Sequence, residues 1–124
     1  MQQLPEGLFY GTWRSYKSFL HTGEVKNHSK DNYLEFVFAD DRKLAISNYD
    51  NGKSKKLDET TDWSLVFKEK RYYLSVNGKG LEYEIITINH VAFVVQDTQT
   101  LDKYFCARVK TWETYIKKTE PYTL

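Results

Sequence analysis

The chain is poor in the residues that crosslink a small fold or interrupt a β-sheet. Its 124 residues contain a single cysteine, Cys106, so an intrachain disulfide is excluded. The two prolines, Pro5 and Pro121, lie near the ends. Because proline cannot donate a backbone N–H to a strand ladder, their absence from the middle leaves it free to form uninterrupted sheet. A chain of this length holds one hydrophobic core, which indicates a single domain over residues 1–124.

The chain also has no large excess of positive or negative charge. The chain carries 18 basic and 17 acidic residues, a formal net charge of +1. This balance supplies no field that would attract nucleic acid, so we expect no nucleic-acid partner. No run is long and apolar enough to span a bilayer, so we expect no membrane span. Residues 1–7 lack the basic and apolar regions of a signal peptide, which predicts a cytoplasmic protein as written, or a periplasmic or secreted one if a leader was removed.

Motifs of catalysis and metal binding are missing as well. The histidines, His21, His28 and His90, have no neighbouring cysteine and no tight metal-site spacing, and we interpret them as solvated loop residues. No Gly-x-Ser-x-Gly segment is present, and the carboxylate pair Asp40–Asp41 fits a hairpin tip. We therefore expect a protein that is not an enzyme and uses neither metal nor cofactor. An inward carboxylate or histidine with a strongly perturbed pKa would reopen the enzymatic interpretation.

What the chain does have is aromatic side chains in alternating patterns. Aromatic residues make up 16% of it, ten of them tyrosine. Pairing Phe38 with Leu44, and Phe36 with Ile46, keeps every large apolar residue on one face, which predicts a hairpin. An Asn-Gly pair between alternating segments favours a type I′ turn. The same alternation predicts Phe67 opposite Tyr72 and Leu65 opposite Leu74 across a turn at 69–70, and Leu74 opposite Leu81 and Tyr72 opposite Tyr83 across Asn77–Gly78.

Two segments fit the alternation less directly. The residues Ile85, Ile86 and Ile88 cannot all face one side of a flat strand, and a three-residue turn at 88–90 would solve this by placing Ile85 opposite Phe93. The polar segment 48–60 predicts a loop with one short strand near Leu57. Neither segment shows the periodicity of a helix.

The strands together predict the fold class: all-β, an antiparallel up-and-down β-barrel of about eight strands. The first strand is expected at about residues 8–19, after a lead-in over 1–7. The last is expected over 103–110, before a C-terminal tail over 113–124 that is either a short helix or an extended strap. Both faces of this last strand carry apolar groups, so its inner face is either Phe105, Ala107 and Val109 or Tyr104, Cys106 and Arg108.

The order of these motifs resembles the bacterial lipocalin-like domains of the calycin superfamily. Gly11-Thr12-Trp13 opens the first strand, Asp62-Trp63-Ser64 comes midway, and Tyr104-Phe105-Cys106-Ala107-Arg108 closes the barrel. The resemblance covers residues 8–109. It implies that Gly11, Trp13 and Arg108 close one end of the barrel, with the arginine guanidinium stacked across the indole and Lys110 as the alternative partner. That role requires Arg108 to face inward.

Two functions follow from an eight-stranded barrel, and both stay open. The first is binding of a small apolar or amphipathic molecule inside, with Tyr72 or Tyr83 orienting it by hydrogen bonds. The second is a protein-protein interaction or inhibitor module whose barrel is filled by its own side chains and which acts through exposed aromatics and the 48–60 segment. The predicted ligand-binding residues are those expected to face inward: Phe36, Ile46, Trp63, Leu65, Tyr72, Leu74, Tyr83 and Phe93.

Overall fold

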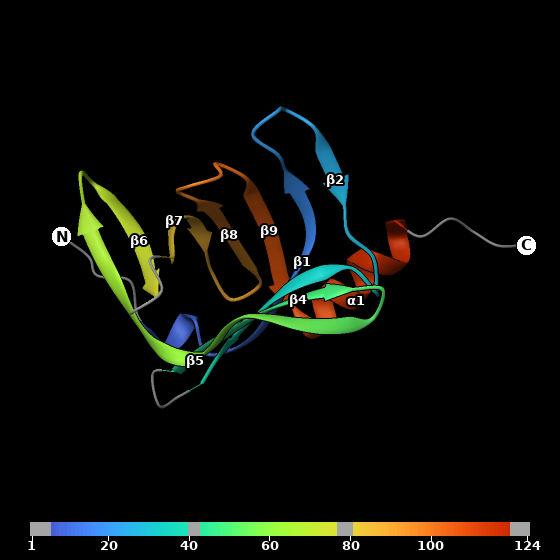
Figure 1. The fold of residues 1–124 in the computed structure, drawn as a ribbon, viewed down its shortest axis with the longest axis horizontal. Coiled ribbons are helices and arrows are strands. Elements are labelled where there is room, and N and C mark those ends of the chain that lie inside the picture. The colour runs from blue at the N-terminus through green and yellow to red at the C-terminus, as the bar shows by residue number, and fades with distance from the viewer. Residues whose placement is uncertain (1–5, 40–42, 77–80, 120–124) are drawn as a thin grey trace, which may run out of the picture.

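The protein is a closed antiparallel β-barrel, which confirms the predicted fold class. The computed structural model describes residues 6–39, 43–76 and 81–119. Among them, nine strands form one sheet in the order β2-β1-β3-β4-β5-β6-β7-β8-β9, and pairing of β1 with β9 closes it (Figure 1). The strands are β1 (Gly11–Phe19), β2 (Val25–Asn27), β3 (Tyr33–Phe38), β4 (Lys43–Asp50), β5 (Lys53–Lys68), β6 (Arg71–Val76), β7 (Leu81–Ile88), β8 (Ala92–Asp97) and β9 (Lys103–Arg108).

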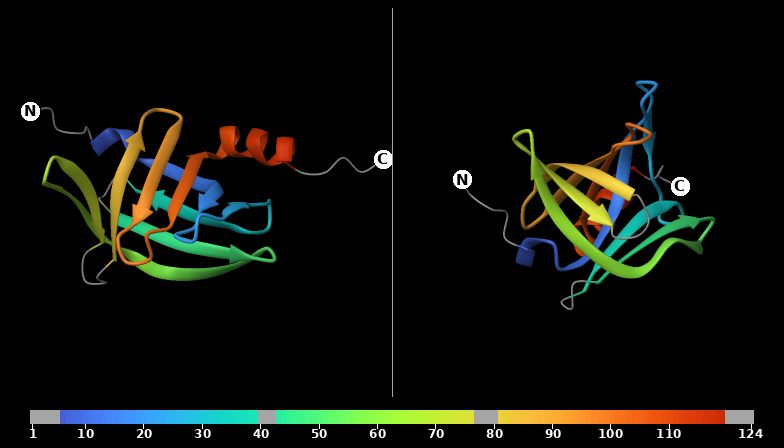
Figure 2. Two further views of the ribbon diagram at one scale, coloured as in Figure 1. Left: turned by 90° about the horizontal axis from the view of Figure 1, so that it is seen from above. Right: turned by 60° about the vertical axis from the view of Figure 1, so that its left-hand side comes forward.

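Two helical segments flank the strands along the chain, one before β1 and one after β9. A short 3-10 helix, η1 (Glu6–Leu8), precedes β1, so the first strand begins at Gly11 rather than near residue 8. The helix α1 (Val109–Thr119) follows β9, which ends two residues earlier than predicted, and the described part of the C-terminal tail is thus a helix rather than a strap. Figure 2 shows α1 outside the barrel wall. There Trp112 and Ile116 pack against Tyr33 and Ala107.

Two of the predicted hairpins are confirmed in register. Phe36 pairs with Ile46 and Phe38 with Leu44 between β3 and β4. Between β5 and β6, Leu65 pairs with Leu74 and Phe67 with Tyr72, across a two-residue turn at 69–70. Both turn residues, Glu69 and Lys70, have positive φ angles of 53° and 64°. The pattern of apolar residues therefore outweighed the cost of left-handed backbone at two residues that are not glycine.

The predicted register between β6 and β7 is wrong by two residues. Leu74 pairs with Tyr83 rather than with Leu81, and Val76 pairs with Leu81. The predicted turn at Asn77–Gly78 lies outside the described residues. Because side chains alternate with a period of two, a shift of two residues leaves every apolar side chain on the same face, and alternation alone could not detect it.

The predicted three-residue turn between β7 and β8 is also wrong. Ile88 pairs with Phe93, and Ile85 pairs with Val95. The register shifts between these pairs because Ile86 is an extra residue in a β-bulge. The bulge lets Ile85 and Ile88 both pack against the core while Ile86 is exposed. It thereby resolves the conflict that the isoleucine spacing poses.

The prediction of a loop over 48–60 is wrong, because this segment is mostly strand. β4 continues to Asp50 and β5 begins at Lys53, joined by Asn51–Gly52 with φ angles of 53° and 79°. Asn-Gly at this place carries the same type I′ signal as the pair at 77–78. Residues 51–55 are exposed, so this end of the hairpin has no buried face and shows no apolar alternation.

The two ends of the barrel differ in what fills them. At the closed end, where β1 begins and β9 ends, Phe9, Phe38, Trp63 and Phe93 pack with neighbouring ring centroids 5.2 to 5.9 Å apart. The open end, where β1 ends and β9 begins, carries the turns at 20–24, 51–52 and 98–102. The inner face of β9 carries Tyr104, Cys106 and Arg108. Burial raises the pKa of the Cys106 thiol, so this cysteine is an inert core residue.

Candidate functional site

The closed end is held by contacts between Trp13 and Arg108. Trp13 is fully buried, and its Nε1–H donates to the backbone carbonyl of Phe9 over 2.9 Å. The guanidinium carbon of Arg108 lies 3.9 Å from the centre of the Trp13 ring. The same guanidinium donates to the carbonyls of Leu8 and Tyr10, which ties η1 and the start of β1 to the end of β9. Partial burial lowers the pKa of Arg108 from its usual high value, which leaves it charged at neutral pH.

Gly11 belongs to this closure for a steric reason. Its φ angle is +114°, and a Cβ added there would lie 2.6 Å from Nη1 of Arg108. Only glycine combines this backbone conformation with so close an approach. The structure thus brings together Gly11, Trp13 and Arg108, the three residues that the resemblance implies for barrel closure.

Most of the predicted ligand-binding residues belong to the packed core. Leu65 is half-buried and packs on the core, whereas Tyr72 packs against Phe67 with the two rings tilted and their centroids 4.8 Å apart. Phe67 is 43% exposed and lies near the end of the β5–β6 hairpin, which projects beyond the neighbouring strands (Figure 1). The remaining predicted residues are buried in the main core cluster: Phe36, Ile46, Trp63, Leu74, Tyr83 and Phe93.

A cavity of about 450 Å³ lies instead at the open end of the barrel. Leu34 forms part of its floor and also belongs to the core cluster, so the cavity sits directly above the packed interior. Most of the residues that line it carry hydroxyl, amide, imidazole or charged groups, while carbon atoms form the larger part of the lining surface. The lining residues are Ser18, Leu20, Lys26, Asn27, His28, Asn32, Tyr33, Leu34, Asn48, Tyr49, Asp50 and Tyr104.

His28 is the most constrained polar group at this cavity. Its Nδ1 lies 2.5 Å from the Ser15 hydroxyl oxygen, and its Nε2 lies 3.1 Å from the Ser18 hydroxyl oxygen. Both serines are buried, and the Ser15 oxygen also accepts the backbone N–H of Leu34 over 2.8 Å. The interpretation of His28 as a solvated loop residue is therefore wrong.

Sequence reasoning missed this cluster because a bulge creates it. Residues 15 and 18 should face opposite sides of a regular strand. The pairing of β1 with β9 shifts between Ser15 and Lys17, and this shift turns both Ser15 and Ser18 toward the interior. Two serines three apart in a strand give no periodic signal, and their partner His28 lies outside the named strands.

The protonation of His28 follows from its surroundings. Burial above all, together with the positive charge of Lys26, lowers its pKa to about 4, while the backbone of Ser15 opposes the decrease. The imidazole is therefore neutral at pH 7, with one ring nitrogen that donates a hydrogen bond and one that accepts. Helix α1 supports this wall of the site, since Nε1–H of Trp112 donates to the Ser15 carbonyl over 2.9 Å.

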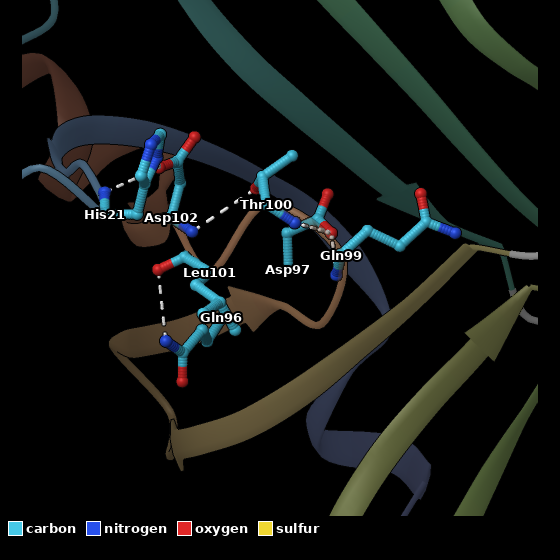
Figure 3. Close-up of polar contacts among 7 residues, drawn as sticks. All are labelled: His21, Gln96, Asp97, Gln99, Thr100, Leu101 and Asp102. Atoms are coloured by element: carbon cyan, nitrogen blue, oxygen red, sulfur yellow. Dashed lines mark hydrogen bonds and ion pairs between the residues drawn. The ribbon is translucent and has the colours of Figure 1, made fainter.

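A polar network joins two turns at the rim of the open end (Figure 3). The Asp102 carboxylate accepts the backbone N–H of His21 over 2.8 Å and lies 3.2 Å from its Nδ1. These contacts, the backbone hydrogen bond above all, lower the pKa of Asp102. Asp97 in turn accepts the backbone N–H groups of Gln99 and Thr100, which shapes the 98–102 turn. The turns that follow β1 and precede β9 are thereby held together beside the cavity.

Other classes of site are not evident in the described part of the chain. Within residues 6–39, 43–76 and 81–119, no three histidine, cysteine or carboxylate side chains are grouped so as to hold a metal ion. No helix in those ranges is long and apolar enough to cross a membrane. Comparison with protein-family models gives no match, and comparison with curated proteins gives none either.

Proposed function

We propose that this protein is a lipocalin-like binding protein of the calycin superfamily, of bacterial type, which holds a small amphipathic molecule in the cavity at the open end of its barrel. The closed antiparallel barrel is compatible with this class, and the order of motifs along the chain resembles it. The observation that carries the proposal is the cavity of about 450 Å³, a volume within the range of small-molecule sites.

The lining supports an amphipathic rather than a wholly apolar molecule. Leu20 and Leu34 offer aliphatic contacts at the floor and side, whereas Ser18, His28 and Asn48 offer polar contacts. Six of the eight residues first predicted to bind ligand, all except Leu65 and Tyr72, belong to the packed core beneath this cavity. Their role in the proposal is to hold the floor in place.

His28 is an inward histidine with a strongly lowered pKa, the feature that would reopen an enzymatic function. Two observations favour binding instead. A pKa of about 4 makes the imidazole a weak base at neutral pH. Both ring nitrogens already contact serine hydroxyls, and no carboxylate of the described residues contacts either one. We therefore propose that the site binds its molecule without transforming it.

The second candidate, a protein-interaction module, draws on the β5–β6 hairpin. Val66 and Phe67 are exposed there, and the barrel beneath the cavity is filled by its own aromatic rings. An interaction surface with a filled barrel would need no ligand. The presence or absence of a bound small molecule separates the two candidates.

Native mass spectrometry of the purified protein, paired with a thermal-shift screen of fatty acids and aromatic metabolites, tests the proposal. We expect a co-purified small mass or a rise in Tm with one class of compound. Asn48→Trp, which fills the cavity from β4, should abolish the effect, whereas Glu113→Trp on the exposed side of α1 should retain it. A clean apo mass with no shift for any compound would contradict the proposal and favour the protein-interaction module.

A further inference from the structure

We infer that the cavity selects molecules with a hydrogen-bond-accepting oxygen, a carbonyl or carboxylate oxygen, through the Ser18 hydroxyl, which Ser15 and His28 orient as a donor. We call the three side chains the Ser15–His28–Ser18 relay. The inference deepens the proposed function and rests on it, since it names the chemical class of the bound molecule. It depends on the direction of each hydrogen bond in the relay.

The direction begins at Ser15, which is fully buried. Its hydroxyl oxygen already accepts the backbone N–H of Leu34. Its own hydroxyl hydrogen needs an acceptor, because a buried donor without one is costly. Nδ1 of His28, at 2.5 Å, is the acceptor that the hydrogen bonds of the described residues provide for it. Ser15 therefore donates to Nδ1.

The state of His28 follows from this step. With Nδ1 as acceptor, the single hydrogen of the neutral imidazole sits on Nε2. Nε2 lies 3.1 Å from the Ser18 hydroxyl oxygen, so the imidazole donates and Ser18 accepts. The lowered pKa of His28 agrees with this neutral form. The direction of the Ser15 hydrogen bond thus sets, through the imidazole, that the Ser18 hydroxyl oxygen accepts.

Ser18 is then left with a hydroxyl hydrogen that it must donate elsewhere. It is 1% exposed, lines the cavity, and has no further hydrogen-bond partner among the described residues. Tyr104 lies directly across from it in the β1–β9 register and lines the same cavity. Burial raises the pKa of Tyr104, so its hydroxyl is also a protonated donor. Ser18 and Tyr104 thus place two hydroxyl donors in the lining of one cavity, and both favour an acceptor oxygen in it.

The charges around the cavity do not favour a cationic molecule over one with a hydrogen-bond-accepting oxygen. One lysine and one aspartate, Lys26 and Asp50, belong to the lining, and both are exposed. Their charges balance, so recognition depends on the hydroxyl donors. A carbonyl and a carboxylate share the required oxygen, and the test below separates them.

The first part of the test is heteronuclear NMR of the imidazole nitrogens of the wild-type protein at pH 7, which needs no variant and no ligand. The relay predicts that His28 carries its hydrogen on Nε2. A hydrogen on Nδ1 would reverse the relay and overturn the inference, whatever the protein binds.

The second part compares three probes of similar length by amide shift titration: methyl hexyl ketone, octanoate and octane. We expect the ketone or octanoate to bind with at least about tenfold higher affinity than octane. Ser18→Ala should reduce that preference by about tenfold, whereas Ser75→Ala, at a strand serine outside the cavity, should leave it unchanged. The ketone and octanoate arms show whether a neutral or an anionic oxygen is preferred.

The outcomes separate this inference from the proposed function. Equal binding of all three probes, or an undiminished preference in Ser18→Ala, would overturn the inference and leave a binding protein. Failure of every probe to shift the cavity amides would count against both. If Ser18→Ala does not fold, the comparison of probes in the wild-type protein decides the matter on its own.

Discussion

Strand β1 contributes to both the closed and the open end of the barrel, and the two ends differ in the side chains that β1 directs into the interior. At the closed end that residue is Trp13, whose ring packs 5.4 Å from Phe93 and beneath the Arg108 guanidinium. At the open end it is Ser15 and Ser18, which are as deeply buried but far smaller. The large side chains meet and fill the interior, whereas the small ones leave a cavity above them. Side-chain volume along one strand thus separates a structural end from a candidate binding end.

The largest expected effect breaks the closed end. Trp13→Ala should lower the free energy of unfolding by about 3 to 5 kcal/mol, because it removes a fully buried ring and leaves the Arg108 guanidinium without its stacking partner. Urea denaturation measures the change. Ser18→Ala, at the open end of the same strand, should cost less than about 1.5 kcal/mol. Equal losses in the two variants would contradict the division between the two ends.

A smaller effect concerns the stability of the open end against acid. The pKa of His28 is 6.5 in the unfolded chain and about 4 in the folded one, so the unfolded state binds the proton more readily. The stabilisation is therefore complete above pH 6.5 and is lost as the pH falls toward 4. Allowing for solvent screening, His28 contributes about 2 kcal/mol to this pH dependence.

Urea denaturation at a series of pH values measures this contribution. His28→Gln should lose less stability than the wild-type protein between pH 7 and pH 4. The matched variant His90→Gln, at an exposed turn residue, should follow the wild-type curve. Superimposable curves for the wild type and His28→Gln would show that His28 does not titrate as an inward residue.

The smallest expected effect lies at the rim. Asp102→Asn should change the free energy of unfolding by less than about 1 kcal/mol, because its contacts with His21 are at the surface. It should nevertheless speed amide hydrogen exchange in the 20–24 and 98–102 turns, which the carboxylate joins. Glu84→Gln, which loses the ion pair with Arg71, should leave exchange in both turns unchanged. Unaltered exchange in Asp102→Asn would show that the network does not hold the rim.

Much of the barrel could be predicted because its hairpins repeat one local rule. Alternation placed Phe36 opposite Ile46 and Leu65 opposite Leu74, and both pairings are correct. The same rule failed at Ile86, where a bulge interrupts the period of two. It also failed at Leu74, because a register shift of two residues leaves the pattern of inward and outward side chains unchanged. A bulge residue moves every following side chain of the strand to the opposite face, and the amino-acid composition does not indicate where a bulge occurs.

The candidate site was less predictable than the fold. The large apolar residues expected to line it, such as Phe36 and Phe93, pack against each other at a centroid distance of 5.6 Å. The polar residues that do line the open end lie on β1, β2, β3, β4 and β9, far apart in the chain. His28 gave no sign of its burial, since its two serine partners lie 10 and 13 residues away.

By itself the sequence determined that this chain is an all-β barrel, because period-two alternation and the shortage of proline act locally, residue by residue. The resemblance of its motif order to lipocalin-like domains also pointed to Gly11, Trp13 and Arg108 as the residues that close one end. Only the tertiary structure decided where the barrel is filled and where it is hollow, which way β9 faces, and that His28 stands neutral between two serines. These properties depend on whether side chains from distant strands meet at the barrel axis, and on a bulge in β1 that no local pattern announces.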